Sequence, residues 1–258
     1  MNILKQVNHW TVKCSNDSKG RKFLALNDKS AVILSGGLGT RLKPFTNTIP
    51  KPLLPIGEKA VLEIQIERLA KCGFKNIYLA TNYKADYVEK FLGDGSRYGV
   101  KLYVSKEEKP LGTAGPIKLL ETQLTSPFLV MNGDILTLLN FNEIYEFAYR
   151  NDSLFTAGIK KIIMPYAFGN IHFNGDIVTK IEEKPDMITY ALAGIYVMKP
   201  EIMKMIPSNE YFGIDKLLQK MLNKDLPIYK FEIKDYWLDI GRIDDYEKAQ
   251  EEFKPFIE

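Results

Sequence analysis

The glycine-rich stretch LSGGLGTRLKP at residues 34–44 contains the clearest chemical signal in this sequence. Because glycine lacks a Cβ atom, the backbone N–H groups of Gly36, Gly37 and Gly39 can close around phosphate oxygens. Arg41 adds a planar fork of donors that suits the same oxygens. The stretch therefore predicts a phosphate-binding loop, although a tight turn that merely needs glycine would use the same residues.

This loop does not match the two best-known nucleotide-binding fingerprints. A P-loop requires Gly-Lys-Ser or Gly-Lys-Thr directly after its glycines, and neither follows Gly39. A dinucleotide-binding loop requires a small third residue and then a helix, but Leu42 is large and Pro44 would break that helix. A nicotinamide-dependent dehydrogenase is therefore a rival interpretation that the sequence disfavours.

Two lysines stand beside prolines, which restrict the backbone around them. Lys51 lies in Pro-Lys-Pro at 50–52, so its ammonium group is held in one direction. Lys184 lies in Glu-Glu-Lys-Pro at 182–185, where it could bind a phosphate while Glu183 accepts hydrogen bonds from sugar hydroxyls. Each of these two motifs could equally be a solvated stretch of the surface. For Lys51, the nearby glycine loop favours a role in phosphate binding.

Two aspartates follow apolar stretches and could hold a metal ion. Asp134 follows the apolar run PFLVMN and Gly133, and Asp239 lies within YWLDIG at 236–241. In an open α/β sheet, ligands bind beyond the carboxyl ends of the strands. Magnesium binds in such places through one or two carboxylates together with substrate phosphates. We therefore expect Mg²⁺ at Asp134, with Asp239 as the candidate second ligand, although an aspartate there can also simply form a turn.

Strand and helix patterns alternate in the first half of the chain and would position these groups. Short apolar runs indicate buried strands, and apolar residues every three or four positions indicate helices. The expected strands are Ala31–Ser35, Asn76–Thr81, Lys101–Ser105 and Phe128–Asn132, and the expected helices are 60–72, 84–92, 114–124 and 141–150. Alternation of this kind produces a mostly parallel sheet with helices on both faces.

The second half of the chain is richer in strands. Strands are expected at 154–161, 169–173, 177–183, 192–198 and 228–233, a hairpin turn at 174–176, and helices at 200–206, 214–224 and 243–253. The fold class is therefore α/β and Rossmann-like, with a mixed, mostly parallel sheet. We expect a single catalytic domain at 30–258, preceded by a polar N-terminal arm at 1–29 that contains one short strand at Lys22–Leu26.

Composition and charge narrow the class of protein. The 258 residues are 45% hydrophobic and 26% charged, which suits a globular domain and excludes a disordered chain. The formal net charge of +3 is too small to favour nucleic acid as a partner. The two cysteines lack metal-site spacing, and a disulfide between Cys14 and Cys72 is not favoured. No run approaches the roughly 18 apolar residues of a membrane span, so we expect a cytoplasmic protein with no membrane partner.

Taken in order, the motifs resemble those of the sugar-1-phosphate nucleotidyltransferases. That family carries GGxGTRLxPLT followed by PKP. The same pattern stands here as GGLGTRLKPFT at 36–46 and PKP at 50–52, with Phe45 in place of leucine. Further matches are LGTAGP at 111–116, NGD at 132–134, EEKP at 182–185, AGIYV at 193–197 and WLDIG at 237–241. The resemblance covers about residues 30–250 and is closest to the mannose-1-phosphate guanylyltransferase-like branch.

This resemblance implies a GT-A-like nucleotidyltransferase fold and a reaction that converts a nucleoside triphosphate and a sugar-1-phosphate into a nucleotide-sugar and pyrophosphate. Arg41 would bind the triphosphate, Lys51 the α-phosphate or the sugar phosphate, and Lys184 the sugar-1-phosphate. Asp134 and Asp239 would bind Mg²⁺. The nucleotide would lie against Leu34, Gly36, Gly37, Gly39, Thr40, Leu111, Gly112, Gly115, Asn132 and Gly133, and the sugar against Gly169, Glu183 and Gly194.

The resemblance leaves the substrates and the assembly open. The small residues of the segment 111–116 favour GTP because they leave room for a purine, but UTP, dTTP and CTP would meet the same backbone groups. A catalytically weak regulatory homologue that binds nucleotide-sugars is a further alternative, although loss of a motif residue would be its signature. Many relatives are homo-oligomers, so this chain is a candidate for one.

Overall fold

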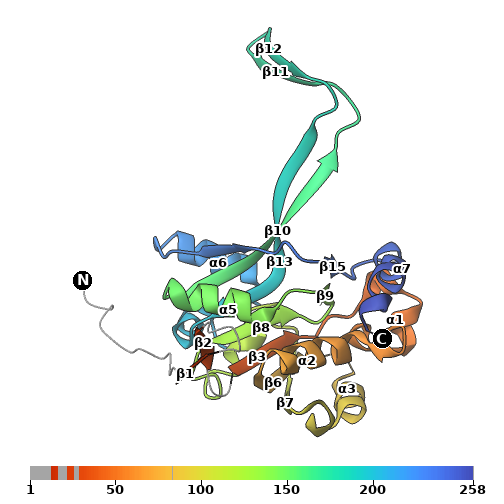
Figure 1. Ribbon diagram of the computed structural model, residues 1–258, viewed down its shortest axis with the longest axis vertical. Coiled ribbons are helices and arrows are strands. Elements are labelled where there is room, and N and C mark those ends of the chain that lie inside the picture. The colour runs from red at the N-terminus through yellow and green to blue at the C-terminus, as the bar shows by residue number, and fades with distance from the viewer. Residues whose placement is uncertain (1–12, 17–21, 26–28, 83, 258) are drawn as a thin grey trace.

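The computed structural model describes residues 13–16, 22–25, 29–82 and 84–257, and these residues form a seven-stranded central sheet (Figure 1). The strand order is β14–β10–β13–β8–β3–β6–β7. In chain order the strands are β3 (Lys29–Leu34), β6 (Phe74–Thr81), β7 (Lys101–Lys106), β8 (Phe128–Asn132), β10 (Phe155–Pro165), β13 (Asp186–Met198) and β14 (Tyr229–Glu232). Strands β3, β6, β7 and β8 are parallel, whereas β13 is antiparallel to both of its neighbours. The expected mixed, mostly parallel sheet is confirmed.

Helices cover both faces of this sheet. Helices α2 (Val61–Lys71), α3 (Ala85–Leu92) and α5 (Phe141–Arg150) pack on one face, and α4 (Gly115–Lys118) and α6 (Ile214–Leu222) pack on the other. Helix α7 (Ile243–Glu252) packs in a third, separate cluster, and the short helix α1 is Phe45–Thr48. Side chains alternate between the two faces along β3: Ala31 and Ile33 join the cluster under α2 and α5, and Val32 joins the cluster under α4 and α6. The continuous apolar runs in the sequence therefore mark strands that are buried on both sides.

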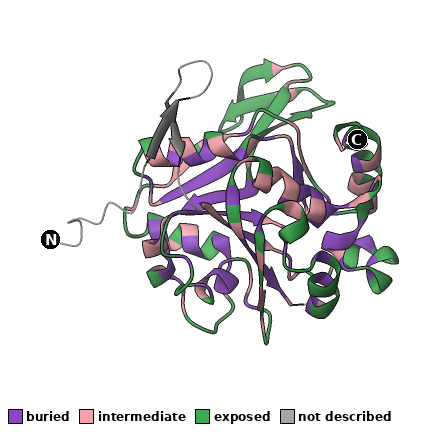
Figure 2. Cartoon of the chain, turned by 60° about the horizontal axis from the view of Figure 1, so that its bottom comes forward, coloured by how far each residue is buried: buried purple, intermediate pink, exposed green. Residues whose placement is uncertain are grey.

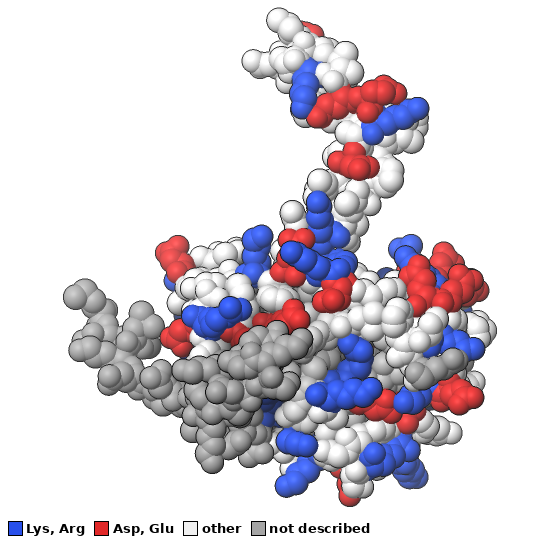
Figure 3. Space-filling view, in the orientation of Figure 1, with Lys and Arg blue, Asp and Glu red and all other residues white. Residues whose placement is uncertain are grey.

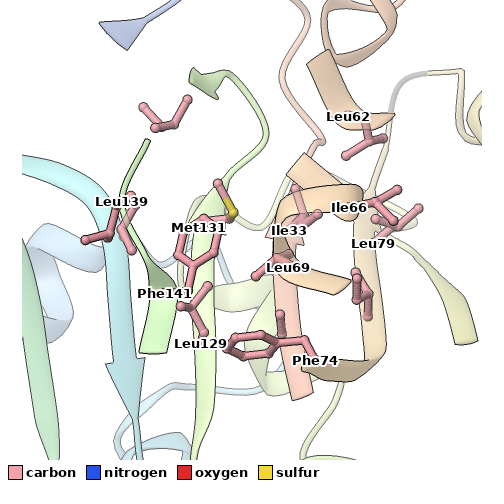
Figure 4. Packing of buried hydrophobic residues seen from close by; sticks show 14 of the residues in the cluster. Ile33, Leu62, Ile66, Leu69, Phe74, Leu79, Leu129, Met131, Leu139 and Phe141 are labelled. Carbon is pink, nitrogen blue, oxygen red and sulfur yellow. The ribbon is translucent and has the colours of Figure 1, made fainter. Parts of the chain in front are cut away.

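Helix α2 illustrates how the sequence builds the core. Leu62, Ile66 and Leu69 recur every three or four residues and are fully buried. Figure 4 shows them beside Ile33 and Leu79, which come from the adjacent strands β3 and β6. Burying one such side chain is worth about 1.5–3 kcal/mol, so this face fixes the helix on the sheet. In Figure 2 the strands in the middle of the molecule are accordingly coloured as buried.

Short elements complete the described part of the chain. The two-stranded sheets are β1 (Lys13–Asn16) with β2 (Lys22–Ala25), β4 (Pro55–Ile56) with β5 (Lys59–Ala60), β9 (Ile135–Thr137) with β15 (Trp237–Asp239), and β11 (Asn170–Asn174) with β12 (Ile177–Glu182). The 3₁₀ helices are η1 (Thr40–Leu42), η2 (Lys51–Leu53), η3 (Ser96–Tyr98), η4 (Pro200–Met205) and η5 (Lys254–Phe256). The β9–β15 pair matters most for function, because it brings the C-terminal part of the chain beside the end of β8.

Two of the expected helices differ in the structure. The helix expected at 114–124 is only the four-residue α4 followed by turns, because most of its later N–H groups bond to carbonyls three residues back. Its periodicity is nevertheless real, since Ile117, Leu120 and Leu124 are all buried. The helix expected at 200–206 is the 3₁₀ helix η4.

Strands β10 and β13 are longer than expected and run beyond the edge of the other strands. They pair with each other from Ile159↔Leu192 to Pro165↔Asp186 without interruption. At the far end the chain continues into the small β11–β12 hairpin (Figure 1). We call residues 159–192 the projecting ribbon. Mutual pairing satisfies about half of the backbone hydrogen-bonding groups of these two strands, and the groups along their outer edges have no partner among the described strands beyond Ile159.

The N-terminal region contributes the antiparallel pair β1–β2. The expected strand at Lys22–Leu26 corresponds to β2, with Leu26 outside the described residues. Cys72 is a free thiol. Among the described residues, none of the helices has the length and apolar character needed to cross a bilayer.

Candidate active site

A cleft of about 390 Å³ opens where β3 and β8 end. These strands are adjacent and parallel, so their carboxyl ends lie at the same edge of the sheet. Many residues that the sequence suggested for ligand binding line this cleft: Leu34, Gly36, Gly37, Gly39, Thr40, Arg41, Lys51, Leu111, Gly112, Asn132, Gly133 and Asp134. Segments that are far apart in the chain therefore meet in one concave site.

The glycine loop is held in place by hydrogen bonds to its neighbours. Ser35 follows β3, and its backbone N–H and hydroxyl both donate to the Ala80 carbonyl, at 2.8 and 3.2 Å. The Thr46 hydroxyl donates to the Gly39 carbonyl at 2.8 Å. Gly39 has a φ of +62°, and a Cβ atom there would stand 2.8 Å from the Thr46 methyl group. Glycine is therefore required at this turn of the loop.

The elements after the loop contradict the dinucleotide-binding interpretation. That fold needs a long helix whose N-terminus meets the pyrophosphate. Here the loop leads into the three-residue η1 and then the four-residue α1, and Leu42 between them is fully buried. The nicotinamide-dependent dehydrogenase considered above therefore lacks its binding element.

Two cations line the described part of the cleft, Arg41 and Lys51. The Nζ atom of Lys51 lies 2.5 Å from Oδ2 of Asp134, and both side chains are largely buried. Arg41 makes no hydrogen bond or ion pair with another described residue, so its five donors are available to a ligand. The cleft thus offers one paired and one unpaired positive charge to a bound anion.

Asp134 and Asp239 form an acidic pair beside these cations. Asp239 lies in β15, which pairs with β9, and the next residue, Ile240, donates its N–H to the Asp134 carbonyl at 2.9 Å. Asp239 is solvent-exposed at the end of β15, although protein atoms surround much of it. Burial first, and then the negative charge of Asp134, raise the pKa of Asp239 to about 6. Lys51 and Arg41 offset the repulsion between the two carboxylates only in part, because the pKa of Asp239 stays raised.

The acidic pair fits a divalent cation. The second carboxylate oxygen of Asp134, Oδ1, is buried and has no hydrogen-bond partner in the described part of the protein. A buried carboxylate oxygen without a donor is costly unless a ligand such as a metal ion satisfies it. Among the described residues, no group of three or more His, Cys, Asp or Glu side chains could hold a metal. Two carboxylates with substrate phosphates are the ligand set that Mg²⁺ accepts.

The opposite wall of the cleft depends on residues that the sequence analysis did not select. Glu107 follows β7, and its Oε2 accepts the Leu111 N–H at 2.8 Å. Burial raises the pKa of Glu107. The Phe212 carbonyl accepts the N–H groups of Ala114 and Gly115, at 2.9 and 3.0 Å. Two distant segments therefore fix the loop 111–116 in position.

Thr113 and Pro116 line the cleft as part of the segment 111–116 that was expected there. The lining residues that were not chosen as candidates are Ser35, Pro52, Ala80, Asn82, Glu107, Pro110, Tyr211 and Gly241. Two of them have a sequence feature that predicts their position, because Asn82 and Glu107 directly follow the parallel strands β6 and β7. Their place after parallel strands could have found them by the same rule that selected Asp134. Tyr211 has no comparable local signal.

Comparisons with known proteins place the chain in a family. The family model described as nucleotidyl transferase matches residues 30–254. The chain belongs to the nucleotidyl transferase family.

Curated relatives of this nucleotidyl transferase include the mannose-1-phosphate guanyltransferase of Yarrowia lipolytica, 36% identical over 83% of this chain. The mannose-1-phosphate guanylyltransferase catalytic subunit beta of Danio rerio is 32% identical over 84% of the chain. The alignments cover 61% and 62% of those two proteins, so the chain spans less than two thirds of their length.

Solved structures give the same result for the fold. HddC from Yersinia pseudotuberculosis is 31% identical, with a TM-score of 0.68 over 87% of this chain and 99% of that one. A putative glucose-1-phosphate thymidylyltransferase from Bacillus anthracis has a TM-score of 0.72 and 25% identity over 86% of this chain and 94% of that one. The nucleotidyltransferase fold expected from the sequence is confirmed.

Six of the residues suggested for this nucleotidyl transferase do not line the cleft. Asp239 lies at the end of β15, two residues before the lining residue Gly241, and Gly115 packs against Leu111. Gly194 touches the cleft from behind, since a Cβ atom there would stand 2.6 Å from the Asn132 amide nitrogen. The remaining three, Gly169, Glu183 and Lys184, lie on the projecting ribbon, away from the cleft (Figure 1).

Proposed function

We propose that this protein transfers a nucleoside monophosphate from a nucleoside triphosphate to a sugar-1-phosphate and releases pyrophosphate. The observation that carries the proposal is the meeting of the glycine loop, Arg41, Lys51 and the Asp134–Asp239 pair at one sheet edge. This set of groups supplies cations and a metal site but no general base, and the reaction needs none. A sugar phosphate is already anionic near neutral pH.

The chemistry is an in-line displacement at phosphorus. An oxygen of the sugar phosphate forms a bond to the α-phosphorus, and the bond from that phosphorus to its bridging oxygen breaks. Pyrophosphate leaves with the electron pair. Because no proton needs to be moved, catalysis rests on positioning the two substrates and on neutralising their charge.

The residues of the cleft divide this work. The N–H groups of the glycine loop and the free guanidinium of Arg41 bind the triphosphate. Lys51 lines the cleft beside Asp134, so its ammonium group is available to stabilise the charge that develops at the α-phosphate. Mg²⁺ bound at Asp134 and Asp239 would supply further neutralisation of the phosphates. Both carboxylates would hold that cation, and Asp134 also orients Lys51 through their ion pair.

We propose GTP as the nucleotide and mannose-1-phosphate, or a closely similar sugar-1-phosphate, as the acceptor. Support comes from the printed names of the relatives in Yarrowia lipolytica and Danio rerio, and from the HddC structure that is titled as a complex with GMP-PN. From the segment 111–116, Leu111, Gly112, Thr113 and Pro116 line the cleft, and the small Gly112 and Thr113 leave room for a purine. Lys184, Glu183, Gly169 and Gly194 are proposed to complete the sugar side.

The experiment is a matrix of substrates. The purified protein is incubated with Mg²⁺, with each of GTP, ATP, UTP, dTTP and CTP, and with mannose-, glucose- and N-acetylglucosamine-1-phosphate. Pyrophosphate release and the mass of the nucleotide-sugar are measured. The largest turnover is expected with GTP and mannose-1-phosphate. Absence of pyrophosphate in every pair would overturn the proposed reaction, whereas faster turnover with another nucleotide would overturn only the choice of GTP.

A further inference from the structure

The projecting ribbon carries most of the exposed large apolar side chains of this protein. Of the 23 such residues in the described part of the chain, 13 lie on residues 163–192. They are Ile163, Met164, Tyr166, Phe168, Ile171, Phe173, Ile177, Val178, Ile181, Met187, Ile188, Tyr190 and Leu192. In Figure 3 the tip of the ribbon is mainly white, and charged side chains of both signs lie in a band below it. An apolar surface is thus concentrated on the segment that has least contact with the core.

This surface is too large to suit a solvated monomer. Each of these side chains exposes roughly half of its area, which together amounts to on the order of 1,000 Å² of mainly apolar surface. The largest apolar patch of a typical monomer is about 300–600 Å², whereas one partner in a standard interface buries about 800 Å². A two-stranded ribbon is also only marginally stable in water by itself. The exposed apolar area of the ribbon is therefore large enough for a stable protein interface, and a partner there would stabilise the ribbon.

The ribbon holds its outer end away from the cleft of its own chain. Its pairing is regular from Ile159↔Leu192 to Pro165↔Asp186, and the one irregularity lies at its base, between Ala157 and Ile159. Seven residue pairs at about 3.4 Å each separate base and outer end by about 20 Å. No described residue of the ribbon lines the cleft.

The described lining of the cleft supplies fewer positive charges than the negative charges of its two proposed substrates. A nucleoside triphosphate brings about four negative charges and a sugar phosphate about two more. The described lining residues offer Arg41 and Lys51, and Lys51 is already paired with Asp134. On the ribbon, Lys184 and Glu183 have no hydrogen-bond or ion-pair partner among the described side chains. Within one chain, the cleft that needs positive charge therefore lies apart from Lys184, whose charge is unpaired among the described side chains.

We propose that two copies of this chain form a symmetric dimer in which the ribbon of each copy lies on the other copy and brings Lys184 and Glu183 to the sugar-phosphate side of its cleft. The exposed apolar side chains of the ribbon form the interface. Because a two-fold axis relates the two copies, each ribbon meets the other copy in the same way. Both clefts therefore receive Lys184 and Glu183 from the other copy. This inference rests on the proposed function, because it assigns the second phosphate to a lysine of the other copy.

The interface is tested by charge substitutions on the ribbon. Ile171 and Ile181 are paired across the β11–β12 hairpin and are both exposed, so the double variant Ile171→Glu, Ile181→Glu should not disturb folding. Sedimentation velocity is expected to give a dimer for the wild type and a monomer for this variant. Tyr87→Glu, at an equally exposed position on α3, is the control and stays dimeric. A monomeric wild type that is fully active would overturn the proposal.

Mixed dimers decide which copy supplies Lys184. One chain carrying Asp134→Asn and another carrying Lys184→Ala are co-expressed with different tags, and the mixed dimer is purified through both tags. If the ribbons exchange between copies, the cleft of the Lys184→Ala chain keeps its own Asp134 and receives Lys184 from the other chain. This one complete site should give about half of the wild-type activity. If each ribbon serves its own cleft, this dimer has no complete site and is inactive, which would overturn the proposal.

The reciprocal mixed dimer is the matched control. Both substitutions are placed in one chain, and the partner chain is wild type. Exchange between copies then leaves no complete site and predicts inactivity, whereas ribbons that serve their own cleft would give about half activity. A wild-type homodimer without activity would refute the proposed function itself. An active wild type with the opposite pattern in the two mixed dimers would refute only the exchange.

Discussion

The ammonium group of Lys51 lies 2.5 Å from one carboxylate oxygen of Asp134, while the other oxygen of Asp134 is buried without a hydrogen bond. Lys51 comes from η2 and Asp134 from the turn after β8, so the tertiary fold brings them together. One carboxylate thus orients a lysine with one oxygen, while its other oxygen has no partner among the described residues. The active-site predictions follow from this division.

Removing the charge of either aspartate is expected to abolish most of the turnover. Asp134→Asn and Asp239→Asn should each lower kcat by about 10²–10³-fold, because each removes a charge that a divalent cation needs. Circular dichroism and thermal unfolding should show an intact fold. Binding of Mn²⁺ measured by electron paramagnetic resonance should weaken in both variants. Asp94→Asn, which changes an exposed aspartate at a surface turn, is the control. Unchanged Mn²⁺ affinity would refute the metal assignment.

Lys184→Ala is expected to affect the sugar substrate more than the nucleotide. The KM for sugar-1-phosphate should rise so that kcat/KM falls by about 10²-fold, because a phosphate dianion loses its counter-charge. The KM for the nucleoside triphosphate should change little. Lys180→Ala is a matched control on the same hairpin, since Lys180 is paired with Glu182 at 2.6 Å. Equal changes in both KM values would show that Lys184 is not specific to the sugar side.

Glu107 is expected to act as a positioning residue for the nucleotide wall. Its carboxylate accepts the Leu111 N–H at 2.8 Å, so Glu107→Ala frees the loop 111–116. Loss of one such hydrogen bond should raise the KM for the nucleoside triphosphate by about tenfold. Glu107→Gln keeps an acceptor oxygen and should restore most of the affinity. If both variants lose the same affinity, the negative charge rather than the hydrogen bond is what matters.

Gly194 should tolerate a side chain less well than another glycine of similar conformation. Gly194 and Gly175 have φ values of +67° and +57°, but a Cβ atom meets Asn132 at 2.6 Å only at position 194. Gly175→Ala is expected to lower the free energy of unfolding by about 1 kcal/mol through backbone strain alone. Gly194→Ala should cost about 1–3 kcal/mol more. Urea unfolding measures both, and equal losses would mean that the contact with Asn132 is relieved without cost.

The N-terminal arm is proposed to lie outside the chemistry. The cleft is lined by residues from Leu34 onward, so deleting residues 1–28 should change kcat and both KM values by no more than about twofold. Steady-state kinetics and sedimentation of the truncated protein are the measurements. A truncated chain that is folded and keeps its oligomeric state but is inactive would place the arm in the active site.

The sequence alone determined the alternation of strands and helices and the glycine loop. These features follow from local rules: apolar runs, three- to four-residue periodicity and the backbone freedom of glycine. Val32 and Leu62 are buried where those rules place them. The rule that ligands bind beyond parallel strands also selected Gly133 and Asp134, which line the cleft.

Only the tertiary structure decided which of these groups meet. The pairing of Lys51 with Asp134 depends on strand order and crossovers, which no local pattern encodes. Tyr211 reaches the cleft for the same reason. The sequence also reads Ile171 and Ile181 as parts of strands, and they are, yet the structure exposes both. An apolar strand shows that a side chain needs a partner, but the three-dimensional arrangement decides whether that partner lies within the same chain.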